Sequence, residues 1–146
     1  MHIKITNATD LDCEIINQIQ RELKRPLRLD CRANDYLVAW LDDTAVGCAG
    51  MTLHLEGSYF YGLSVRRKWQ RQGIGSLLME ARLDATRSGH AEYAVALVMF
   101  WNSRFFRKHG FTPVKRNLLP ESALHHPDLT NPAYTRSAAM LRCIQT

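Results

Sequence analysis

The sequence of 146 residues contains no run of about 18 apolar residues, so we expect no segment to span a bilayer and no membrane partner. Polar residues occur within residues 1–5, too early for the apolar core of a secretory signal peptide. Internal repeats and low-complexity segments are also missing. These absences favour one folded domain over residues 1–146 and a cytoplasmic location.

The sequence also lacks the residue groups that usually bind metal ions or form a disulfide framework. Its cysteines are Cys13, Cys31, Cys48 and Cys143, widely scattered and without a Cys-x-x-Cys pair. We therefore predict reduced, mostly buried thiols. The adjacent His125 and His126 project differently and have only Asp128 as a further ligand nearby, so this stretch is expected to be a polar loop. No metal is predicted.

A net charge of +5 and a pI near 9.2 favour an anionic partner. The basic residues are densest over residues 66–71, and no repeat alternates basic with aromatic residues as on a nucleic-acid platform. Charge alone does not choose between nucleic acid, an acidic metabolite and a phosphate-bearing ligand. The basic segment adjoins a glycine-rich loop, so we expect a small phosphate-bearing ligand and no nucleic acid.

Apolar periodicity predicts a mixed α/β fold, for which 146 residues with 46% apolar content are sufficient. A helix is predicted from Thr9 or Asp10 to about Leu23, and a second over 76–87. Strands are predicted over 3–6, 36–41, 45–53, 59–65, 93–99, 111–115 and 137–144. The polar turn 42–44 favours an antiparallel hairpin, whereas the β-α-β order around residue 75 favours a parallel pair. Residues 25–34 are predicted to be a linker or a short irregular helix.

The most informative segment reads Gln-Arg-Gln-Gly-Ile-Gly at residues 70–75, between a predicted strand and a predicted helix. Glycines at a helix N-terminus let an anion approach unpaired backbone N–H groups, and the helix dipole adds partial positive charge. The segment has neither the Lys-Ser/Thr ending of a P-loop nor the third glycine of a dinucleotide-binding turn. A phosphate-cradling loop and a solvated basic turn are both open interpretations.

Residues 65–75 resemble the acyl-CoA signature of the GNAT N-acyltransferases, a Gln/Arg-x-x-Gly-x-Gly/Ala loop that follows a strand. Residues 105–111 are similar to the same family's helix end, an aromatic-Tyr-x-x-x-Gly-Phe motif. The resemblance spans roughly residues 3–114. It implies one GNAT domain with a mixed, mostly antiparallel central sheet, a splayed parallel pair of strands and flanking helices. Acetyl-CoA is the implied acyl donor, and 25–34 would contribute to the acceptor pocket.

The same resemblance implies which residues bind acetyl-CoA. A strand edge would pair with the pantetheine amides, the loop would hold the pyrophosphate, and an aromatic residue of the later helix would pack beside the pantetheine arm. The implied cofactor-binding residues are Leu63, Ser64, Val65, Gln70, Arg71, Gln72, Gly73, Ile74, Gly75, Ser76 and Phe106.

Two departures from the family pattern concern proton transfer. Many GNAT enzymes have a glutamate as base at the position of Tyr59, and a tyrosine that protonates the leaving thiolate at the position of Phe106. Candidate catalytic substitutes are Tyr59, Glu56 and Tyr61, with His54 nearby. For Glu56 a solvated turn without a catalytic role is the favoured alternative, and for the tyrosines the alternative is packing. For Tyr59 we favour a positioning role, since a hydroxyl donates a hydrogen bond without any special environment.

The C-terminal third resembles the tail of bacterial N-acetylglutamate synthases. Gly-Phe-x-Pro-Val at 110–114 is followed by Leu-Pro-Glu-Ser at 119–122 and by Arg136-Ser137 before the last strand. In those enzymes the arginine is implicated in holding the amino-acid carboxylate. The resemblance makes Arg136 the candidate substrate clamp with Ser137 beside it, and a surface arginine at a strand start is the alternative.

The resulting hypothesis is an acetyl-CoA-dependent N-acetyltransferase that acts by direct attack of a primary amine on the thioester. The acceptor would be small and amino-acid-like, with glutamate as a candidate. Alternatives are an acetyltransferase for protein N-termini or lysines, and an acyl-CoA-binding module with impaired catalysis. Because GNAT domains often dimerise, a homodimer is also considered.

Overall fold

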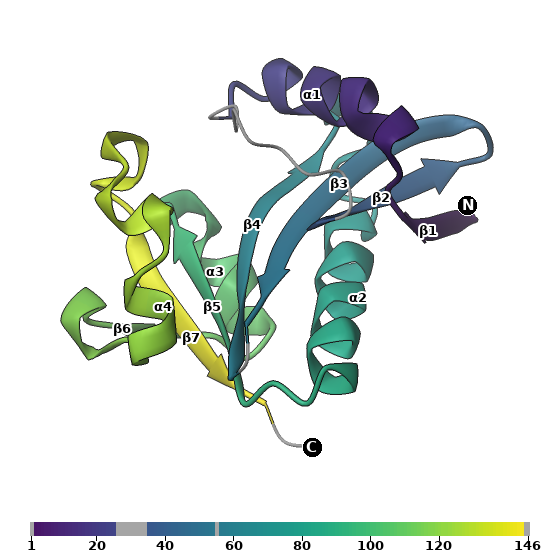
Figure 1. Ribbon diagram of the computed structural model, residues 1–146. Helices are drawn as coiled ribbons and strands as arrows, with labels where there is room; N and C mark the ends of the chain where they lie inside the picture. Colours follow the sequence, from purple (N-terminus) through teal and green to yellow (C-terminus); the bar gives the residue numbers. More distant parts are fainter. Residues whose placement is uncertain (1, 26–34, 55, 145–146) are drawn as a thin grey trace. The chain divides into compact units, whose positions relative to one another are not determined.

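Seven strands and four helices are present in the computed structural model, which describes residues 2–25, 35–54 and 56–144 (Figure 1). The strands are β1 (Ile3–Asn7), β2 (Tyr36–Leu41), β3 (Thr44–Leu53), β4 (Gly57–Val65), β5 (Tyr93–Val98), β6 (Thr112–Val114) and β7 (Ala138–Cys143). The helices are α1 (Cys13–Glu22), α2 (Ile74–Ser88), α3 (Ser103–Lys108) and α4 (Glu121–Leu124). Short 3-10 turns join several of them.

The strands form one sheet in the order β1-β2-β3-β4-β5-β7-β6. Strands β4 and β5 are parallel, whereas β1–β2, β2–β3, β5–β7 and β6–β7 are antiparallel. The parallel ladder runs from Gly57 with Tyr93 to Phe60 with Ala96, although β4 continues to Val65. The prediction of a mixed, mostly antiparallel sheet with one parallel pair is therefore confirmed.

The predicted elements agree with the structure except at their ends. Strand β2 has the predicted bounds, and the polar turn 42–44 joins it to its antiparallel partner β3. Helix α2 begins at Ile74 rather than at residue 76, so Gly75 lies in its first turn and only Gly73 precedes the helix. Of the segment 25–34, residues 26–34 lie outside the described part of the chain.

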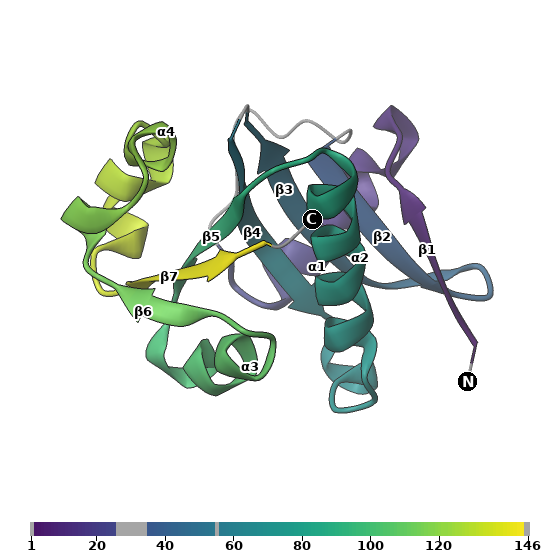
Figure 2. The ribbon, with the colours of Figure 1, turned by 90° about the horizontal axis from the view of Figure 1, so that it is seen from below.

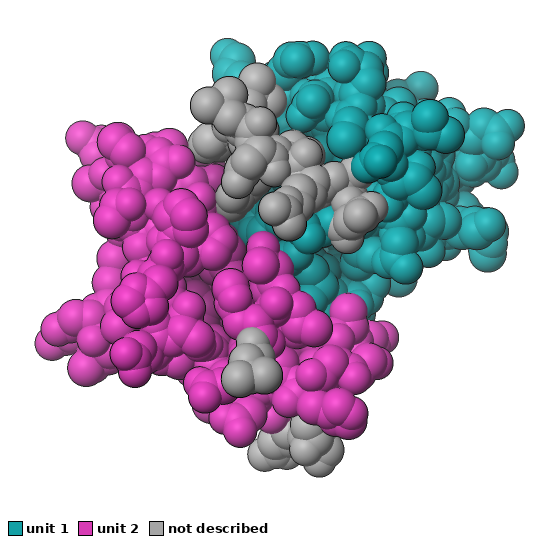
Figure 3. Space-filling view, viewed as in Figure 1, with its two compact units in different colours: residues 1–51, 61–82 teal, residues 52–60, 83–146 magenta. Residues whose placement is uncertain are grey.

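The chain divides into two compact units, coloured separately in Figure 3. Unit 1 comprises residues 1–51 and 61–82, and unit 2 comprises residues 52–60 and 83–146. Three elements, β3, β4 and α2, contribute residues to each unit, because the division falls after Met51, after Phe60 and after Arg82. None of the helices in the described parts of the chain is long and apolar enough to cross a membrane.

Unit 1 is built on the two faces of the β2–β3 hairpin. Alternate strand residues point to opposite faces, and the two sets of apolar side chains pack against different helices. Ile16 and Ile19 of α1 pack with Val38 on one face. On the other face Ile74 and Leu78 of α2 pack with neighbouring strand residues. Figures 1 and 2 show the two helices on opposite sides of these strands.

A buried arginine lies beneath this second face of unit 1. The side chain of Arg82 has no exposed surface, and its guanidinium donates hydrogen bonds to the carbonyl oxygens of Gly50 and Tyr61, at 3.1 and 3.4 Å. Burial lowers the pKa of Arg82 to about 9, opposed by the charge interactions with Cys48 and Tyr61. The side chain therefore ties α2 to the strands at the cost of removing a cation from water.

Unit 2 has β5 at its centre, with the first half of β4 on one side and β7 followed by β6 on the other (Figure 2). Ring–ring contacts link Phe60 of β4 through Phe111 to Phe106 of α3, with centroid distances of 6.0 and 5.2 Å. The hydroxyls of Ser58 and Thr86 form a buried hydrogen bond of 2.8 Å. This core holds the start of β4, which carries Tyr59, in a fixed position.

The prediction that the cysteines are mostly buried is wrong for the described residues. Only Cys48 is buried, Cys13 is half-buried and Cys143 is exposed. Cys143 is the last residue of β7, and burial falls off toward that end of the strand. Cys31 lies outside the described residues.

Candidate functional site

A side chain within the loop that follows β4 is hydrogen-bonded back to the end of that strand. The amide Nε2 of Gln70 donates a hydrogen bond of 2.8 Å to the carbonyl oxygen of Val65, the last residue of the strand. At the same point the backbone N–H of Arg66 donates to the carbonyl of Val46 in β3, at 2.8 Å. These bonds fix where the strand ends and where the loop begins.

We call residues 70–76 the glycine loop. Two of them, Arg71 and Gly73, adopt positive φ angles of 64° and 85°. An ideal Cβ placed on Gly73 would have no heavy atom within 4 Å, so a ligand can approach this backbone closely. Residues 70–73 are exposed, whereas Ile74 is only 1% exposed and anchors the following helix in the unit 1 core. The loop thus presents backbone to solvent from a fixed base.

The electrostatics of the glycine loop favour an anion. The first N–H groups of α2 have no partner within the helix, and its first turn contains no acidic residue. Glu22 of α1 offsets part of the neighbouring positive charge, since it pairs with Arg66 at 3.7 Å and accepts from the N–H of Arg67 at 3.2 Å. The exposed side chain of Arg71 remains next to the helix N-terminus. This arrangement fits a pyrophosphate group.

The end of β4 is held by a polar network inside unit 1. Gly62 has a φ of 65°, and its carbonyl oxygen accepts a hydrogen bond of 3.0 Å from Gln20 Nε2. Ser64 is buried and its hydroxyl donates to Gln20 Oε1 at 3.3 Å. Leu63 and Val65 are half-buried against the face covered by α2. Only the main chain of these predicted cofactor-binding residues is therefore well placed to pair with a ligand amide.

The first half of β4 carries a second group of polar residues, all in unit 2. Tyr59 is 3% exposed, and its hydroxyl donates a hydrogen bond of 2.7 Å to Oδ2 of Asp128, which is 4% exposed. The two residues are 69 positions apart in the sequence. The ring of His126 lies 3.8 Å from the Tyr59 ring, centroid to centroid. We call Tyr59, His126 and Asp128 the tyrosine cluster.

His126 orients Asp128 as well as covering Tyr59. It begins the 3-10 turn Pro127–Thr130, and its Nδ1 accepts a hydrogen bond of 3.1 Å from the backbone N–H of Asp128. An Nδ1 that accepts carries no proton, so neutral His126 has its proton on Nε2. The 4.0 Å contact between this Nδ1 and Asp128 Oδ2 is consequently not a hydrogen bond. The carboxylate is directed instead toward the Tyr59 hydroxyl.

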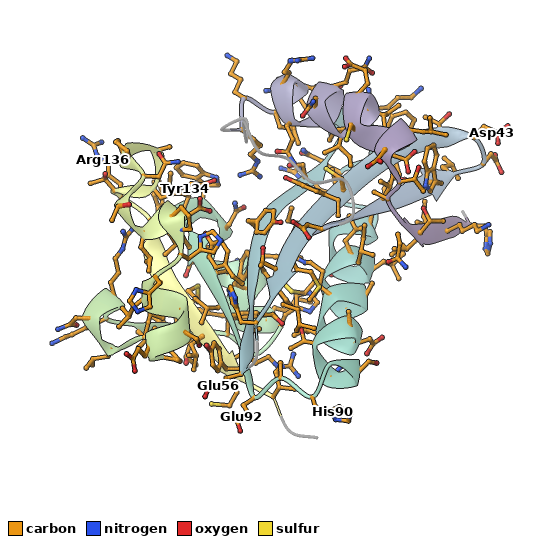
Figure 4. The ribbon with its side chains drawn as sticks, in the orientation of Figure 1. Asp43, Glu56, His90, Glu92, Tyr134 and Arg136 are labelled. Atoms are coloured by element: carbon orange, nitrogen blue, oxygen red, sulfur yellow. The ribbon has the colours of Figure 1, made fainter. Side chains whose placement is uncertain are left out.

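The other two predicted catalytic residues lie in different surroundings. Glu56 is exposed just before β4 begins (Figure 4), and its backbone carbonyl accepts a hydrogen bond of 2.8 Å from the N–H of Glu92. Tyr61 belongs to unit 1, where its ring makes an edge contact with Tyr36 at 5.7 Å and fills the space beside Gly50. Among the three candidates, Tyr59 is the one held against a carboxylate.

Phe106, at the family position of the acid tyrosine, is 8% exposed within the aromatic core of unit 2. It contacts Phe111 and the neighbouring Phe105. Its ring has no hydroxyl and little free surface, so its clearest role in this structure is packing. Its predicted contact with the acyl donor stays a prediction.

The predicted substrate clamp lies on a segment that another arginine holds in place. The guanidinium of Arg116 donates to the carbonyl oxygens of Leu129, Tyr134 and Ser137, with distances of 3.3 Å to Leu129 and 3.0 Å to Ser137. The Ser137 hydroxyl also accepts from Arg116 at 2.9 Å and donates to the Tyr134 carbonyl at 2.7 Å. Arg136 is exposed, and Figure 4 shows it projecting from this fixed segment. Ser137 is therefore committed to internal bonds.

A family model described as "Acetyltransferase (GNAT) domain" matches residues 32–113, more than half of the chain. The chain belongs to the GNAT acetyltransferase family. The matched range contains the glycine loop, Tyr59 and the end of α3. It stops before the segment that carries Asp128 and Arg136, so these two residues have no counterpart in the family match.

Solved structures agree with this fold. N-acetylglutamate synthase from Neisseria gonorrhoeae, complexed with coenzyme A and N-acetyl-glutamate, is 20% identical over 100% of this chain with a TM-score of 0.86. The protein Rv2747 from Mycobacterium tuberculosis, in a complex containing CoA, is 18% identical, with a TM-score of 0.81. The match covers 97% of this chain and 99% of the length of Rv2747. The ribosomal-protein-S18-alanine N-acetyltransferase from Escherichia coli is 18% identical over 99% of this chain and 96% of its own, with a TM-score of 0.76.

The share of each neighbour that is matched differs widely. The chain spans only 36% of the length of the gonococcal synthase, whereas it matches nearly the whole of the other two proteins. No curated protein sequence matches the chain significantly. At identities of 20% or less these similarities establish the GNAT fold and leave the acceptor to be argued from the site.

Three residues of the site were not predicted as functional from the sequence. Residues 125–128 were expected to form a polar loop, which is wrong for Asp128 because this carboxylate is buried against Tyr59. His126 was considered only as a metal ligand, and no group of metal-ligating residues is found within residues 2–25, 35–54 and 56–144. Arg116 had no sequence signal that distinguished it from a surface arginine. The available hint was a His-x-Asp sequence directly after α4.

Proposed function

We propose that this GNAT domain transfers the acetyl group of acetyl-CoA to the primary amine of a small, amino-acid-like acceptor, with glutamate as a candidate. Acetyl-CoA as the acyl donor is supported chiefly by the glycine loop, in which the backbone at Gly73 is open to a ligand next to the N-terminus of α2. The loop would hold the pyrophosphate through backbone N–H groups, and Arg71 would add charge. The main chain of Leu63 to Val65 would pair with the pantetheine amides.

The acceptor half of the proposal is supported by Arg136. An exposed guanidinium on a backbone segment fixed by Arg116 is suited to bind a carboxylate in two parallel charge-assisted hydrogen bonds. A segment held by several internal bonds loses little entropy when the substrate binds. Ser137 would contribute by fixing that backbone, because its hydroxyl is already bonded internally.

The chemistry in this proposal is direct attack of the neutral amine on the thioester carbonyl. Holding the amine and the thioester together can lower the barrier by several kcal/mol. Tyr59 is the catalytic candidate that the structure supports best, since it is buried on β4 and directed at a carboxylate. Glu56 is exposed and Tyr61 packs within unit 1, so we assign neither residue a role in the acetyl transfer.

A protein N-terminus is the second candidate acceptor. The specific observation is that the chain matches nearly the full length of the S18-alanine N-acetyltransferase, whereas it matches about a third of the synthase. Such an acceptor presents an α-amine without a nearby free carboxylate. It would therefore not require Arg136.

The test is release of free CoA thiol from acetyl-CoA by the purified chain, measured with a panel of free amino acids, polyamines and short peptides against a blank without acceptor. We expect turnover with acidic amino acids. Turnover confined to peptides would contradict the small-acceptor proposal and favour the second candidate. Acetyl-CoA binding without any thiol release would indicate the binding module considered from the sequence.

Arg136→Ala tests the acceptor clamp. Loss of two charge-assisted hydrogen bonds should lower kcat/KM for the amino acid about 10- to 100-fold with acetyl-CoA affinity unchanged. Arg87→Ala is the matched control, because it removes another arginine of unit 2, which pairs with Asp84 at 2.9 Å and has no role in the proposed site. Equal losses from both variants would contradict the clamp.

A further inference from the structure

We propose that Asp128 receives the proton of the acceptor amine through the hydroxyl of Tyr59. The tyrosine cluster would in this way supply the carboxylate that the strand itself lacks. The inference rests on the proposed function, because it concerns how the same acetyl transfer handles its protons. Neither the family match nor the similar structures assign a role to Asp128.

The hydrogen-bond direction defines the route. An ordinary phenol, with a pKa of about 10, is a poor base at neutral pH, so Tyr59 alone cannot replace a glutamate. Its hydroxyl hydrogen, however, points at Asp128 Oδ2 over 2.7 Å. A proton that arrives on the Tyr59 oxygen can therefore leave as the original hydroxyl proton moves to the carboxylate. The tyrosine passes the proton on and ends in the protonation state in which it began.

The surroundings of the pair favour a fixed route over a solvent-exposed one. Tyr59 and Asp128 are 3% and 4% exposed, so bulk water does not compete for their hydrogen bond. His126 holds both partners, with its ring against Tyr59 and its Nδ1 accepting the Asp128 N–H. Arg116 in turn fixes the carbonyl of Leu129, the residue after Asp128. The carboxylate is thereby positioned from two sides.

Two imidazole side chains of the described residues lie beside the pair. His126 contacts both members, and His54 of unit 2 makes an edge contact with the His126 ring at 6.5 Å. The Nε2 atom of His54 is buried and has no hydrogen-bond partner among the described residues.

The step balances as follows. The acceptor ammonium loses one proton to the Tyr59 oxygen while the Tyr59 hydroxyl proton passes to Asp128, which leaves a neutral amine. The amine nitrogen forms a bond to the thioester carbon, the C–S bond breaks, and the sulfur leaves with the bonding electron pair. The second proton lost by the nitrogen ends on the thiolate to give free CoA. Asp128 then releases its proton to solvent, so ammonium and acetyl-CoA yield amide, CoA and one proton.

The test compares Asp128→Asn with the wild type across pH 6.5–9.5, using the amine that the wild type acetylates. Asparagine keeps the acceptor oxygen for Tyr59 and cannot take a proton. We expect kcat/KM to fall about 100-fold at pH 7, the size of a general-base contribution. The deficit should shrink at least tenfold by pH 9, where more of the acceptor is already a free amine. The acetyl-CoA Kd should not change.

Tyr59→Phe keeps the ring against His126 and tests the hydroxyl separately. It should show the same loss and pH profile, and the double variant should be no worse than either single one, because the two groups act as one unit. Asp43→Asn, the same chemical change in the exposed β2–β3 turn, should leave activity unchanged. Circular dichroism melting curves confirm that each variant is folded.

The outcomes separate the two proposals. A deficit of Asp128→Asn that is constant at every pH, or wild-type activity in this variant, overturns the proton route and leaves the proposed acetyl transfer standing. A wild-type protein that binds acetyl-CoA but releases no thiol with any amine overturns the proposed function and the proton route together.

Discussion

The glycine loop and the tyrosine cluster are built in opposite ways. The glycine loop is continuous in sequence, lies in unit 1 and presents exposed backbone on a buried base. The tyrosine cluster lies in unit 2, joins residues 69 positions apart and is almost entirely buried. Strand β4 carries Tyr59 of the tyrosine cluster in unit 2, and its other end at Val65 lies in unit 1, where the chain continues toward the glycine loop.

This difference follows from what each part has to do. A phosphate group can be bound by backbone N–H groups and a helix dipole, which any sequence with suitable glycines supplies. A proton acceptor needs one specific side chain at hydrogen-bond distance from the reacting atom, and tertiary structure supplies it. We therefore expect substitutions in the glycine loop to change donor affinity and substitutions around the tyrosine cluster to change turnover or unit 2 stability.

The largest effect should come from Gly73→Val. A β-branched residue at a φ of 85° strains the loop by roughly 1–2 kcal/mol or more, and the side chain enters the space left for the ligand. Together these effects should weaken acetyl-CoA binding about 100-fold, as measured by calorimetric titration.

Asp42→Val is the matched control for that variant. Asp42 also has a positive φ, of 53°, in the β2–β3 turn of the same unit, so valine introduces comparable backbone strain outside the loop. The control should lower the Tm and leave the acetyl-CoA Kd unchanged. A similar loss of affinity in both variants would mean that general destabilisation explains the effect.

An intermediate effect is expected from Arg116→Met, which removes the donors that hold residues 129–137. Several carbonyl groups lose a charged donor at once, so the free energy of unfolding should fall by about 2 kcal/mol in urea. Arg136 lies on the same segment but is exposed, so Arg136→Met should change the free energy of unfolding by less than about 0.5 kcal/mol. Equal losses would contradict the assignment of Arg116 as the structural arginine and Arg136 as the binding one.

The smallest effect concerns Arg82, which tests unit 1 without touching either part of the site. Its folded-state pKa is lowered to about 9 from 12.5, so the unfolded state binds more protons between these values. The penalty of the buried charge is fully present below pH 9 and is relieved as the pH rises. Relative to Arg82→Met, the wild type should gain roughly 0.8 kcal/mol between pH 8.0 and 9.5 in urea unfolding. A gap that does not change with pH would show that Arg82 keeps an ordinary pKa.

The fold was largely predictable because its signals are local. The apolar runs that became β2 and β3, joined by a polar turn, predicted the antiparallel hairpin, and the β-α-β order around the glycine loop predicted the parallel pair. The start of α2 was placed two residues late, because glycine is usually read as a break and Gly75 is helical here. The positive φ of Gly62 within β4 was not predicted, since a positive φ leaves no periodic signal.

In the candidate site, too, the residues of a contiguous motif could be named from the sequence, whereas the contacts between distant residues could not. Every residue of the glycine loop was identified from sequence, because the motif is contiguous. The hydrogen bond between Tyr59 and Asp128 was not, since nothing in the spacing of two residues so far apart indicates that they meet. Asp128 also lies in a stretch whose polarity is typical of an exposed loop. Its burial depends on His126 and Arg116, which act only once the fold has formed.

The most direct test of the separation between donor binding and proton transfer is kcat of Gly73→Val at saturating acetyl-CoA, measured beside kcat of Asp128→Asn. The structure predicts that Gly73→Val regains a kcat within about threefold of the wild type once the donor site is filled, whereas Asp128→Asn stays about 100-fold low at pH 7. A kcat of Gly73→Val that remains as low as that of Asp128→Asn would contradict the separation.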